Sequence, residues 1–263
     1  MTFKEAIYDL TNGAKNHEFW MTFGMNDVKA KYKRSRLGQW WITLSVALFI
    51  FVIAGLFRGV FSVESDNYLA YVSVGYVLWL FMQDSINTGT VILAQAKPFL
   101  MQRKWPISTF VYRLVYREIL IFLHHIVLLP PIFMWLGLWP GFVYMAYAFL
   151  GLAMVIFTGF WVVMIVSIIG LRYRDIQPII QSFLRMAFFA TPIIWLNRDL
   201  GAMGNWIVML NPFSYFVQLV RDPLLDQVFP TQAWLVAIGI TPIMISATIF
   251  VVSKFSERIT FWL

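Results

Sequence analysis

Long uncharged stretches alternate with short polar ones along most of the chain. No Asp, Glu, Lys or Arg lies between Arg36 and Arg58, a stretch of 21 residues. A helix needs about 20 mostly apolar residues to cross a membrane core of ~30 Å, so this stretch is long enough for one span. The 53 uncharged residues between Glu118 and Arg172 are too many for one helix, and the turn sequence GLWPG at 137–141 divides them into two.

The same reasoning predicts an all-α integral membrane protein whose 263 residues form a single transmembrane domain. Composition agrees, because only 13% of the residues are charged, against roughly 25% in a soluble domain. The chain has no Cys, which excludes disulfides and thiolate metal sites. The six predicted spans are about 37–57, 69–92, 114–136, 142–170, 177–196 and 232–253.

Six spans place both termini on one side of the membrane, and the basic residues predict which side. Seventeen Lys and Arg fall on the side of the termini, and three (Arg58, Arg198 and Arg221) fall on the other. Cytoplasmic loops carry the excess of Lys and Arg, so both termini are predicted to be cytoplasmic. The basic run before the first span then predicts a membrane surface and no nucleic-acid partner.

Residues 1–36 are polar and mixed in charge, but Phe19, Trp20, Phe23 and Val28 recur among them at spacings near one face of a helix. Aromatic residues beside a basic end suit the lipid headgroup region. We therefore predict an amphipathic helix lying on the cytoplasmic membrane surface. A solvated tail with scattered aromatics is the alternative.

Residues 200–226 are apolar but interrupted. Asn211 followed by Pro212 favours a helix start, because Asn caps helices and Pro is tolerated at the first helical position. Asp222 and Pro223 are expected to end this second piece. Each piece has about ten residues, too few to span. Two short re-entrant helices are therefore expected to dip into the outer leaflet before the last span.

Two charges fall inside predicted spans, Asp84 in the second and Arg185 in the fifth. Ionisable residues at such depth are functional candidates by default. Arg185 lies ten residues after Asp175, which is roughly 15 Å along a helix. A pair with Asp84 at similar depth is one arrangement. In the other, Arg185 extends to the interface and Asp84 faces water alone.

The sequence contains no phosphate-binding loop G-x-x-x-x-G-K-[ST], no H-E-x-x-H and no G-x-S-x-G. His124 and His125 are adjacent, so their side chains point about 100° apart on a helix and suit one metal ion poorly. An enzymatic function and a metal site therefore have little support. The chain is expected to bind no cofactor itself.

Three stretches carry recognisable motifs. KYKRSRLGQWW at 31–41 fits the pattern R-Y-x-x-S-x-L-G-x-x-W, with Lys in place of the first Arg. RYRDIQPIIQSFLRMAFFATPIIW at 172–195 fits R-[YF]-R-D-[IV]-x-x-[IV] followed by P-I-x-[WY], and LNPFSYFVQLVRDPLL at 210–225 fits L-N-P-[FLM]-x-x-[IFL]-[IV]-x-x-x-R-x-x-[LI]. In this order they resemble the permease subunits of type-two ABC exporters, in the polysaccharide-exporting branch.

The resemblance implies a homodimer in the bacterial inner membrane, paired with two cytoplasmic ATP-binding subunits that hold ATP and Mg²⁺. It implies a coupling helix at about 97–108 that docks on the ATPase and an extracytoplasmic gate at about 200–226. The implied coupling contacts are Lys97, Arg103, Lys104 and Trp105, and the implied gate residues are Asn211, Pro212, Tyr215 and Arg221.

The predicted function is export of a lipid-linked, O-antigen-like polysaccharide through a channel that aromatic residues line. A permease for capsule polysaccharide or teichoic acid is one alternative, and a secondary transporter or a glycan-modifying enzyme is another. Facing lipid is the alternative role for the aromatics, and anchoring at the membrane surface is the alternative role for the basic residues. The channel candidates are Trp40, Trp41, Phe49, Phe51, Phe183, Phe188, Phe189 and Trp195, and the headgroup-binding candidates are Tyr32, Arg34, Arg36, Arg172 and Arg174.

Overall fold

The computed structural model describes residues 3–32, 40–60, 67–196, 201–255 and 258–262, and within these ranges the regular structure is helical. The helices are α1 (Phe3–Lys15), α2 (His17–Tyr32), α3 (Trp40–Val60), α4 (Tyr68–Gln95), α5 (Lys97–Leu100), α6 (Ser108–Ile126), α7 (Leu129–Trp135), α8 (Gly141–Arg172), α9 (Ile176–Ala190), α10 (Gly201–Leu210), α11 (Pro212–Leu225), α12 (Thr231–Phe255) and α13 (Ile259–Trp262).

Five helical stretches are long and apolar enough to cross a membrane, and each corresponds to one of the predicted spans. The third joins α6 and α7 across a break that precedes the proline pair at the start of α7. The five stretches are Trp40–Arg58, Tyr68–Gln95, Ser108–Trp135, Gly141–Arg172 and Thr231–Phe255.

The remaining predicted span, 177–196, corresponds to α9, which has only 15 residues. A helix of this length measures roughly 22 Å, less than the ~30 Å membrane core. α9 ends because Thr191 precedes Pro192 and takes an extended backbone, with φ −93° and ψ 134°. A membrane crossing by α9 therefore stays a prediction.

The segments predicted not to span also form helices, with different bounds. The N-terminal segment forms two helices, α1 and α2, where one was predicted. Helix forms over only Lys97–Leu100 of the predicted coupling helix. The prediction that Asp222 and Pro223 end a helix was wrong, because α11 contains Pro223 and continues to Leu225. A proline in the last turn removes only one backbone donor, and the helix continues for two residues beyond it.

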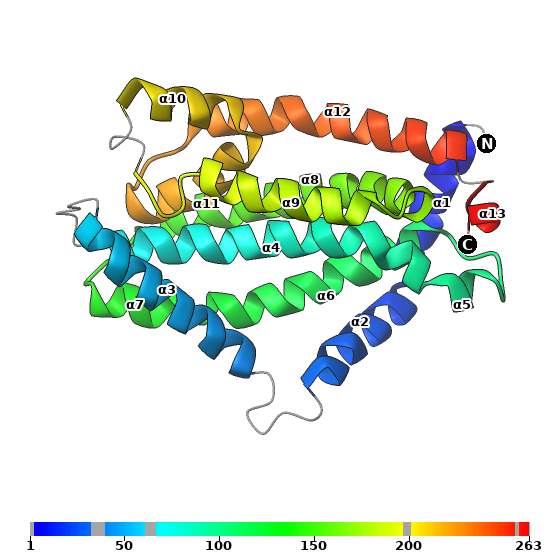
Figure 1. Cartoon of the computed structure of the whole chain (residues 1–263), viewed down its shortest axis with the longest axis horizontal. Coiled ribbons are helices and arrows are strands. Elements are labelled where there is room, and N and C mark those ends of the chain that lie inside the picture. Colours follow the sequence, from blue (N-terminus) through cyan, green and yellow to red (C-terminus); the bar gives the residue numbers. More distant parts are fainter. Residues whose placement is uncertain (1–2, 33–39, 61–66, 197–200, 256–257, 263) are drawn as a thin grey trace.

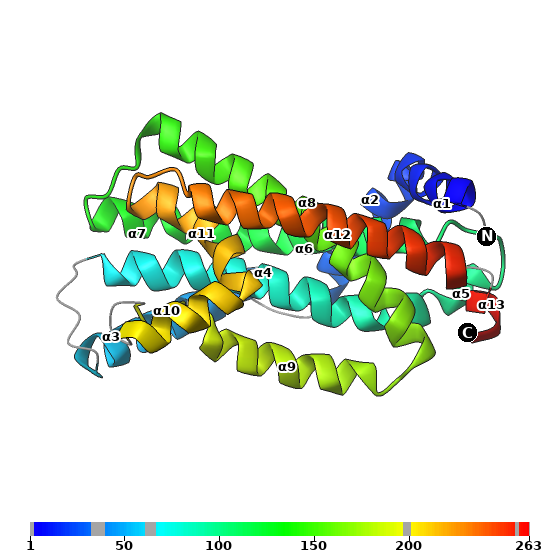
Figure 2. The ribbon, with the colours of Figure 1, turned by 90° about the horizontal axis from the view of Figure 1, so that it is seen from above.

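The long helices α4, α6, α8 and α12 run side by side along the molecule (Figures 1 and 2). The short helices α1, α5 and α13 gather at one end, whereas α7 and α10 lie toward the other (Figures 1 and 2). In Figure 1, α2 and α3 slant away from this bundle. The first and last described helices therefore share one end of the molecule.

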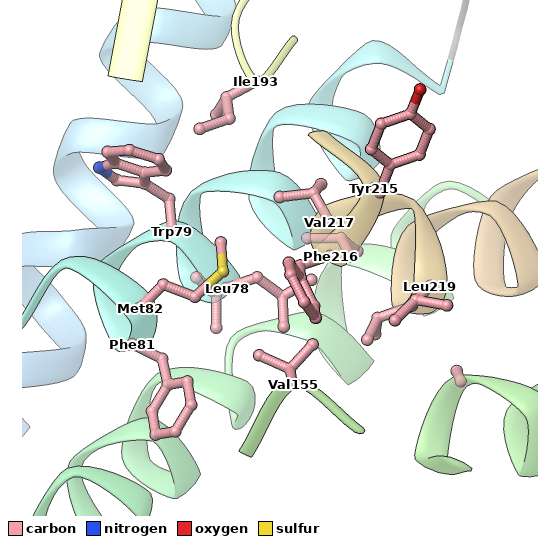
Figure 3. Close-up of a cluster of buried hydrophobic side chains, with 14 of the residues drawn as sticks. Leu78, Trp79, Phe81, Met82, Val155, Ile193, Tyr215, Phe216, Val217 and Leu219 are labelled. Atoms are coloured by element: carbon pink, nitrogen blue, oxygen red, sulfur yellow. The ribbon is translucent and has the colours of Figure 1, made fainter. Parts of the chain in front are cut away.

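The largest apolar core surrounds α11, which lies inside the bundle rather than on its surface. Figure 3 shows Phe216 of α11 beside Val155 of α8, on the same side as Leu78 and Met82 of α4. A Cβ added to Gly151 of α8 would lie 2.2 Å from the carbonyl oxygen of Leu219, so glycine lets the two backbones touch. The second predicted gate helix is thus a core element.

Candidate functional site

A cavity of about 190 Å³ lies between α3, α4 and α9, and we call it the aromatic groove. Its rings contact one another, because Phe49 stacks on Tyr76 with 4.3 Å between ring centroids. Phe188 lies 6.1 Å from Tyr76 and 5.7 Å from Trp79. The groove is lined by Phe49, Tyr76, Trp79, Leu80, Gln83, Arg185, Phe188 and Phe189.

Three of the predicted channel aromatics line the aromatic groove, namely Phe49, Phe188 and Phe189. Phe189 is 66% exposed, so its ring is open to whatever occupies the space beside α9. Trp40 and Trp41 are exposed at the start of α3, outside the groove. The structure therefore brings together one residue of the predicted first span and two of the fifth.

The other three channel candidates point elsewhere. Phe51 lies 6.3 Å from Trp135 of α7, on another side of α3. Phe183 lies 6.5 Å from Phe213 of α11. Trp195 is buried, and its Nε1 donates to a backbone carbonyl of α9 at 2.9 Å. None of these three rings lines the groove; Trp195 is buried, whereas Phe51 and Phe183 are 45% and 53% exposed.

The second predicted span supplies groove residues that sequence reasoning missed. Tyr76, Trp79 and Gln83 lie three and four residues apart on α4, which places them on one helix face. The Trp79 Nε1 donates to Gln83 Oε1 at 2.7 Å, so the indole orients the amide. A search for aromatic and amide residues at this spacing finds the stripe, but the sequence does not show that α4 faces α3 and α9.

The two charges predicted to lie within the membrane line different cavities. Arg185 lines the aromatic groove, and its Nη2 donates to Ser182 Oγ at 3.0 Å. Asp84 lines a polar cavity of about 520 Å³ between α2, α4 and α6. Gln83 and Asp84 are adjacent in sequence but belong to the walls of separate cavities. The structure thus places the two charges of the hypothesised pair on separate sides of α4.

The polar cavity holds two ion pairs that the sequence analysis did not predict. Arg113 donates from Nε and Nη2 to both carboxylate oxygens of Asp27, at 2.8 and 2.6 Å. Arg117 pairs with Glu118 next to it. These residues belong to α6, which begins at Ser108, and the two-point contact of Arg113 ties α2 to α6.

The predicted ATPase contacts lie in the coupling segment, residues 97–105, between α4 and α6. Lys97, Arg103 and Lys104 are exposed, whereas Trp105 is half-buried. The guanidinium carbon of Arg103 lies 5.0 Å from the centroid of the Trp105 ring. The Trp105 ring in turn lies 4.7 Å from Phe19 of α2. The segment thus exposes basic side chains, and Arg103 lies over a Trp105 ring that packs against α2.

Asp9 of α1 binds the start of α6, beside the coupling segment. Its carboxylate accepts from the backbone N–H of Ile107 at 2.8 Å and of Ser108 at 3.0 Å, and Ser108 Oγ donates to the Asp9 carbonyl at 2.8 Å. Helix N-termini leave such N–H groups unpaired and favour anions. Burial raises the pKa of the Asp9 carboxyl, although these hydrogen bonds act in the opposite direction.

Arg221 occupies the centre of the predicted gate and is only 5% exposed. Its Nη1 donates to the carbonyl of Pro192, in the turn that follows α9, and its guanidinium carbon lies 4.0 Å from the Tyr71 ring centroid. The Tyr71 hydroxyl donates to the same carbonyl at 2.9 Å. Burial raises the pKa of the adjacent Asp222 carboxyl to about 6, with Arg221 opposing the shift.

The remaining gate residues fix the start of α11. Pro212 is its first residue, and the Asn211 side chain accepts from the backbone N–H of Phe213 at 3.0 Å, as the predicted cap requires. The Asn211 Nδ2 also donates to Thr191 Oγ1 at 2.8 Å. Tyr215 is buried, and its hydroxyl donates to a carbonyl of α10 at 3.2 Å. The gate residues therefore join α10 and α11 to the end of α9.

The basic residues proposed to bind a headgroup do not form one described cluster. The guanidinium carbon of Arg172, at the end of α8, lies 4.8 Å from the Trp262 ring centroid of α13, and Arg174 is exposed. Arg34, Arg36 and the side chain of Tyr32 lie outside the described residues.

Residues 19–225 match the family model described as ABC-2 type transporter. The chain is also similar to proteins named O-antigen export system permease protein RfbA. One from Klebsiella pneumoniae is 25% identical over 200 residues, which cover 74% of this chain and 76% of that protein. One from Myxococcus xanthus is 25% identical over 169 residues, 64% of this chain and 65% of that protein. Another from Klebsiella pneumoniae is 23% identical over 203 residues, 77% and 78% of the two chains.

Proposed function

Because the chain belongs to the ABC-2 type transporter family, we propose that it is the permease subunit of an ATP-driven exporter of a lipid-linked, O-antigen-like polysaccharide. The names of the relatives support this cargo. In this chain the aromatic groove carries the proposal, since ring faces pack on the apolar faces of sugars without a fixed set of hydrogen bonds. Such a wall suits a polymer that must slide.

The proposed assembly contains a second copy of this chain and two cytoplasmic ATP-binding subunits, which bind ATP and Mg²⁺. It lies in the bacterial inner membrane with both termini cytoplasmic. In this arrangement α9 is the fifth of six crossings, and the turn at 191–195 with α10 and α11 completes its outer part. The position of α1 and α13 at one end of the molecule is consistent with this orientation.

The proposed cycle begins when ATP binding closes the two ATP-binding subunits. The coupling segment receives this motion, and the contacts of its Trp105 ring with Phe19 of α2 and Phe110 of α6 pass it to the spans. The lipid-linked cargo enters from the cytoplasmic leaflet with its pyrophosphate near Tyr32, Arg34, Arg36, Arg172 or Arg174. Its glycan then moves along the aromatic groove, and α10 and α11 close the outer end between cycles.

Capsule polysaccharide and teichoic acid remain second candidates within the same family, because the aromatic groove serves any long glycan. No specific observation favours a secondary transporter or a glycan-modifying enzyme. Among the described residues, no group of three or more His, Cys, Asp and Glu side chains is arranged to hold a metal ion.

The test replaces two groove rings, the half-buried Phe188 and the exposed Phe189, in cells that depend on this permease for surface polysaccharide. The double variant Phe188→Ala, Phe189→Ala is expected to lower surface polysaccharide severalfold, measured by gel analysis of extracted glycolipid. Phe149→Ala is the matched control, because Phe149 is 71% exposed on α8, outside the aromatic groove. Unchanged export by the double variant at equal membrane abundance would contradict the proposal.

A further inference from the structure

Arg185 is the cation of the aromatic groove. Its guanidinium donates to Ser182 Oγ, and within the described residues no carboxylate lies at ion-pair distance from it. Arg185 is exposed, and it differs from the more buried arginines Arg113, Arg117 and Arg221, each of which has a carboxylate partner. Arg185 therefore keeps most of its donors available on a groove wall.

In the proposed crossing of the membrane by α9, a cation without a carboxylate partner is costly, so the position of Arg185 calls for a partner. The guanidinium presents five N–H donors in a planar fork that matches the oxygens of carboxylate and phosphate. Gln83 lies in the same groove with its Oε1 already accepting from Trp79 Nε1, which leaves the two donors of its amide nitrogen. The polar side chains of the groove thus offer donors.

We propose that Arg185 and Gln83 bind an anionic group of the cargo, so that the aromatic groove selects a glycan bearing carboxylate or phosphate. This rests on the proposed function, because it assigns a substrate class to the same groove. The anion has two sources: acidic sugars within the glycan, or the pyrophosphate that joins the glycan to its lipid. The aromatic rings pack against the sugar faces, and Arg185 binds the anionic group of the cargo.

The test uses the full chain in nanodiscs of zwitterionic lipid and three labelled probes. They are a neutral mannose oligosaccharide, a galacturonate oligosaccharide of equal length and a polyprenyl pyrophosphate without sugar. Binding is compared by equilibrium dialysis for the native chain, Arg185→Gln, Arg185→Lys and Arg258→Gln. Arg258 is the matched control because it is an exposed arginine far along the chain from the groove residues.

We expect Arg185→Gln to weaken at least one anionic probe by about tenfold or more, the effect of losing a hydrogen bond to a charged group. The neutral oligosaccharide should bind as before, Arg185→Lys should lose less, and added salt should weaken the anionic probe only when position 185 is charged. A loss confined to galacturonate assigns acidic sugars, and a loss confined to the pyrophosphate assigns the lipid linkage.

Equal binding of both anionic probes by the native chain and Arg185→Gln would overturn the inference, as would an equal loss for all three probes. Failure of the proposed function gives a different result. In that case the neutral oligosaccharide does not bind, or binds equally well to the Phe188→Ala, Phe189→Ala variant, whatever stands at position 185.

Discussion

The two ends of the molecule attach short helices to the spans by opposite chemistry. At the start of α6, the Asp9 carboxylate accepts from two backbone N–H groups. After the end of α9, Arg221 and Tyr71 donate to the carbonyl of Pro192, and Tyr68 donates to the carbonyl of Ile194. In each case a side chain pairs with backbone groups that have no partner within a helix. A helix start leaves N–H donors without such a partner, and a helix end leaves carbonyl acceptors.

The two attachments differ in their partners, although both are buried. Asp9 is 8% exposed and Arg221 is 5% exposed. The Asp9 carboxylate accepts from neutral N–H groups at the start of α6, whereas Arg221 lies in α11 beside the Asp222 carboxylate, at 3.8 Å. Removing one member of a buried charge pair leaves the other charge uncompensated, which costs more than losing hydrogen bonds to neutral groups. The end of the molecule at α11 should therefore depend more strongly on its charged residue than the end at α1 does.

Replacing Arg221 tests this difference most directly. Arg221→Met should lower the stability of the chain by about 2–4 kcal/mol, because it removes one of the two donors to the Pro192 carbonyl and leaves the Asp222 carboxylate without its cation. The measurement is the thermal unfolding midpoint of the purified chain in detergent. Arg221→Lys, which keeps the positive charge, should lower the midpoint less than Arg221→Met. Arg258→Met, at an exposed arginine, is the control, and an equal midpoint for both Met variants would remove the distinction.

The corresponding change at the other end is Asp9→Asn. It should cost about 1–2 kcal/mol, because the amide keeps one acceptor for the two N–H groups at the start of α6. Amide hydrogen exchange at Ile107 and Ser108 should accelerate while the gate stays protected. Glu18→Gln in the exposed first turn of α2 is the matched control. Protection at 107 and 108 that equals the native chain would show that α1 is held by packing alone.

The Asn211 side chain has two roles: it caps the start of α11, and it links that start to Thr191 after α9. Asn211→Ala should cost about 1 kcal/mol, the usual loss of a helix cap. Asn211→Asp keeps the acceptor for Phe213 but loses the donor to Thr191, so it separates the two roles. Exchange at Phe213 should accelerate in the Ala variant only. Faster exchange in both variants would assign the main effect to the Thr191 contact.

The smallest expected effect is a pH dependence from Asp222. Its pKa rises from 3.8 to about 6 on folding, so the native chain binds this proton more strongly than the unfolded chain. The resulting stability is complete below about pH 4 and is lost as pH rises through about 6, which predicts a gain of roughly 1 kcal/mol or less between pH 7 and pH 5. Unfolding midpoints at the two pH values should differ less in Asp222→Asn. An unchanged difference would assign the dependence to other groups.

The sequence predicts the features that depend on local composition. Uncharged stretches of sufficient length mark the five spans, because hydrocarbon excludes charges wherever the chain crosses it. The pair Asn211–Pro212 correctly predicts the start of α11, because a cap acts within a few residues. The proline after Thr191 carries a local signal as well, and it ends α9 earlier than the uncharged stretch indicated.

The unpredicted features depend on contacts between distant segments. Asp9 binds residues 98 and 99 positions away, and Asp27 binds Arg113 across 86 positions. The aromatic groove combines single faces of three helices, and only their packing selects Phe49, Phe188 and Phe189 from the predicted channel rings. Periodicity identifies the faces of one helix, but it does not identify which neighbour each face meets.

The touching backbones of Gly151 and Leu219 divide the gate into two parts with different evolutionary freedom. Any side chain at position 151 would displace α11 from α8, so we expect chains of this family with the same packing to keep glycine there. The outward residues of α10, such as Trp206 and Leu210, are exposed and carry no such constraint. The sequence of α10 can therefore change as the cargo changes, while the packing of α11 on α8 is kept. An alignment of relatives would show more variation in α10 than at position 151.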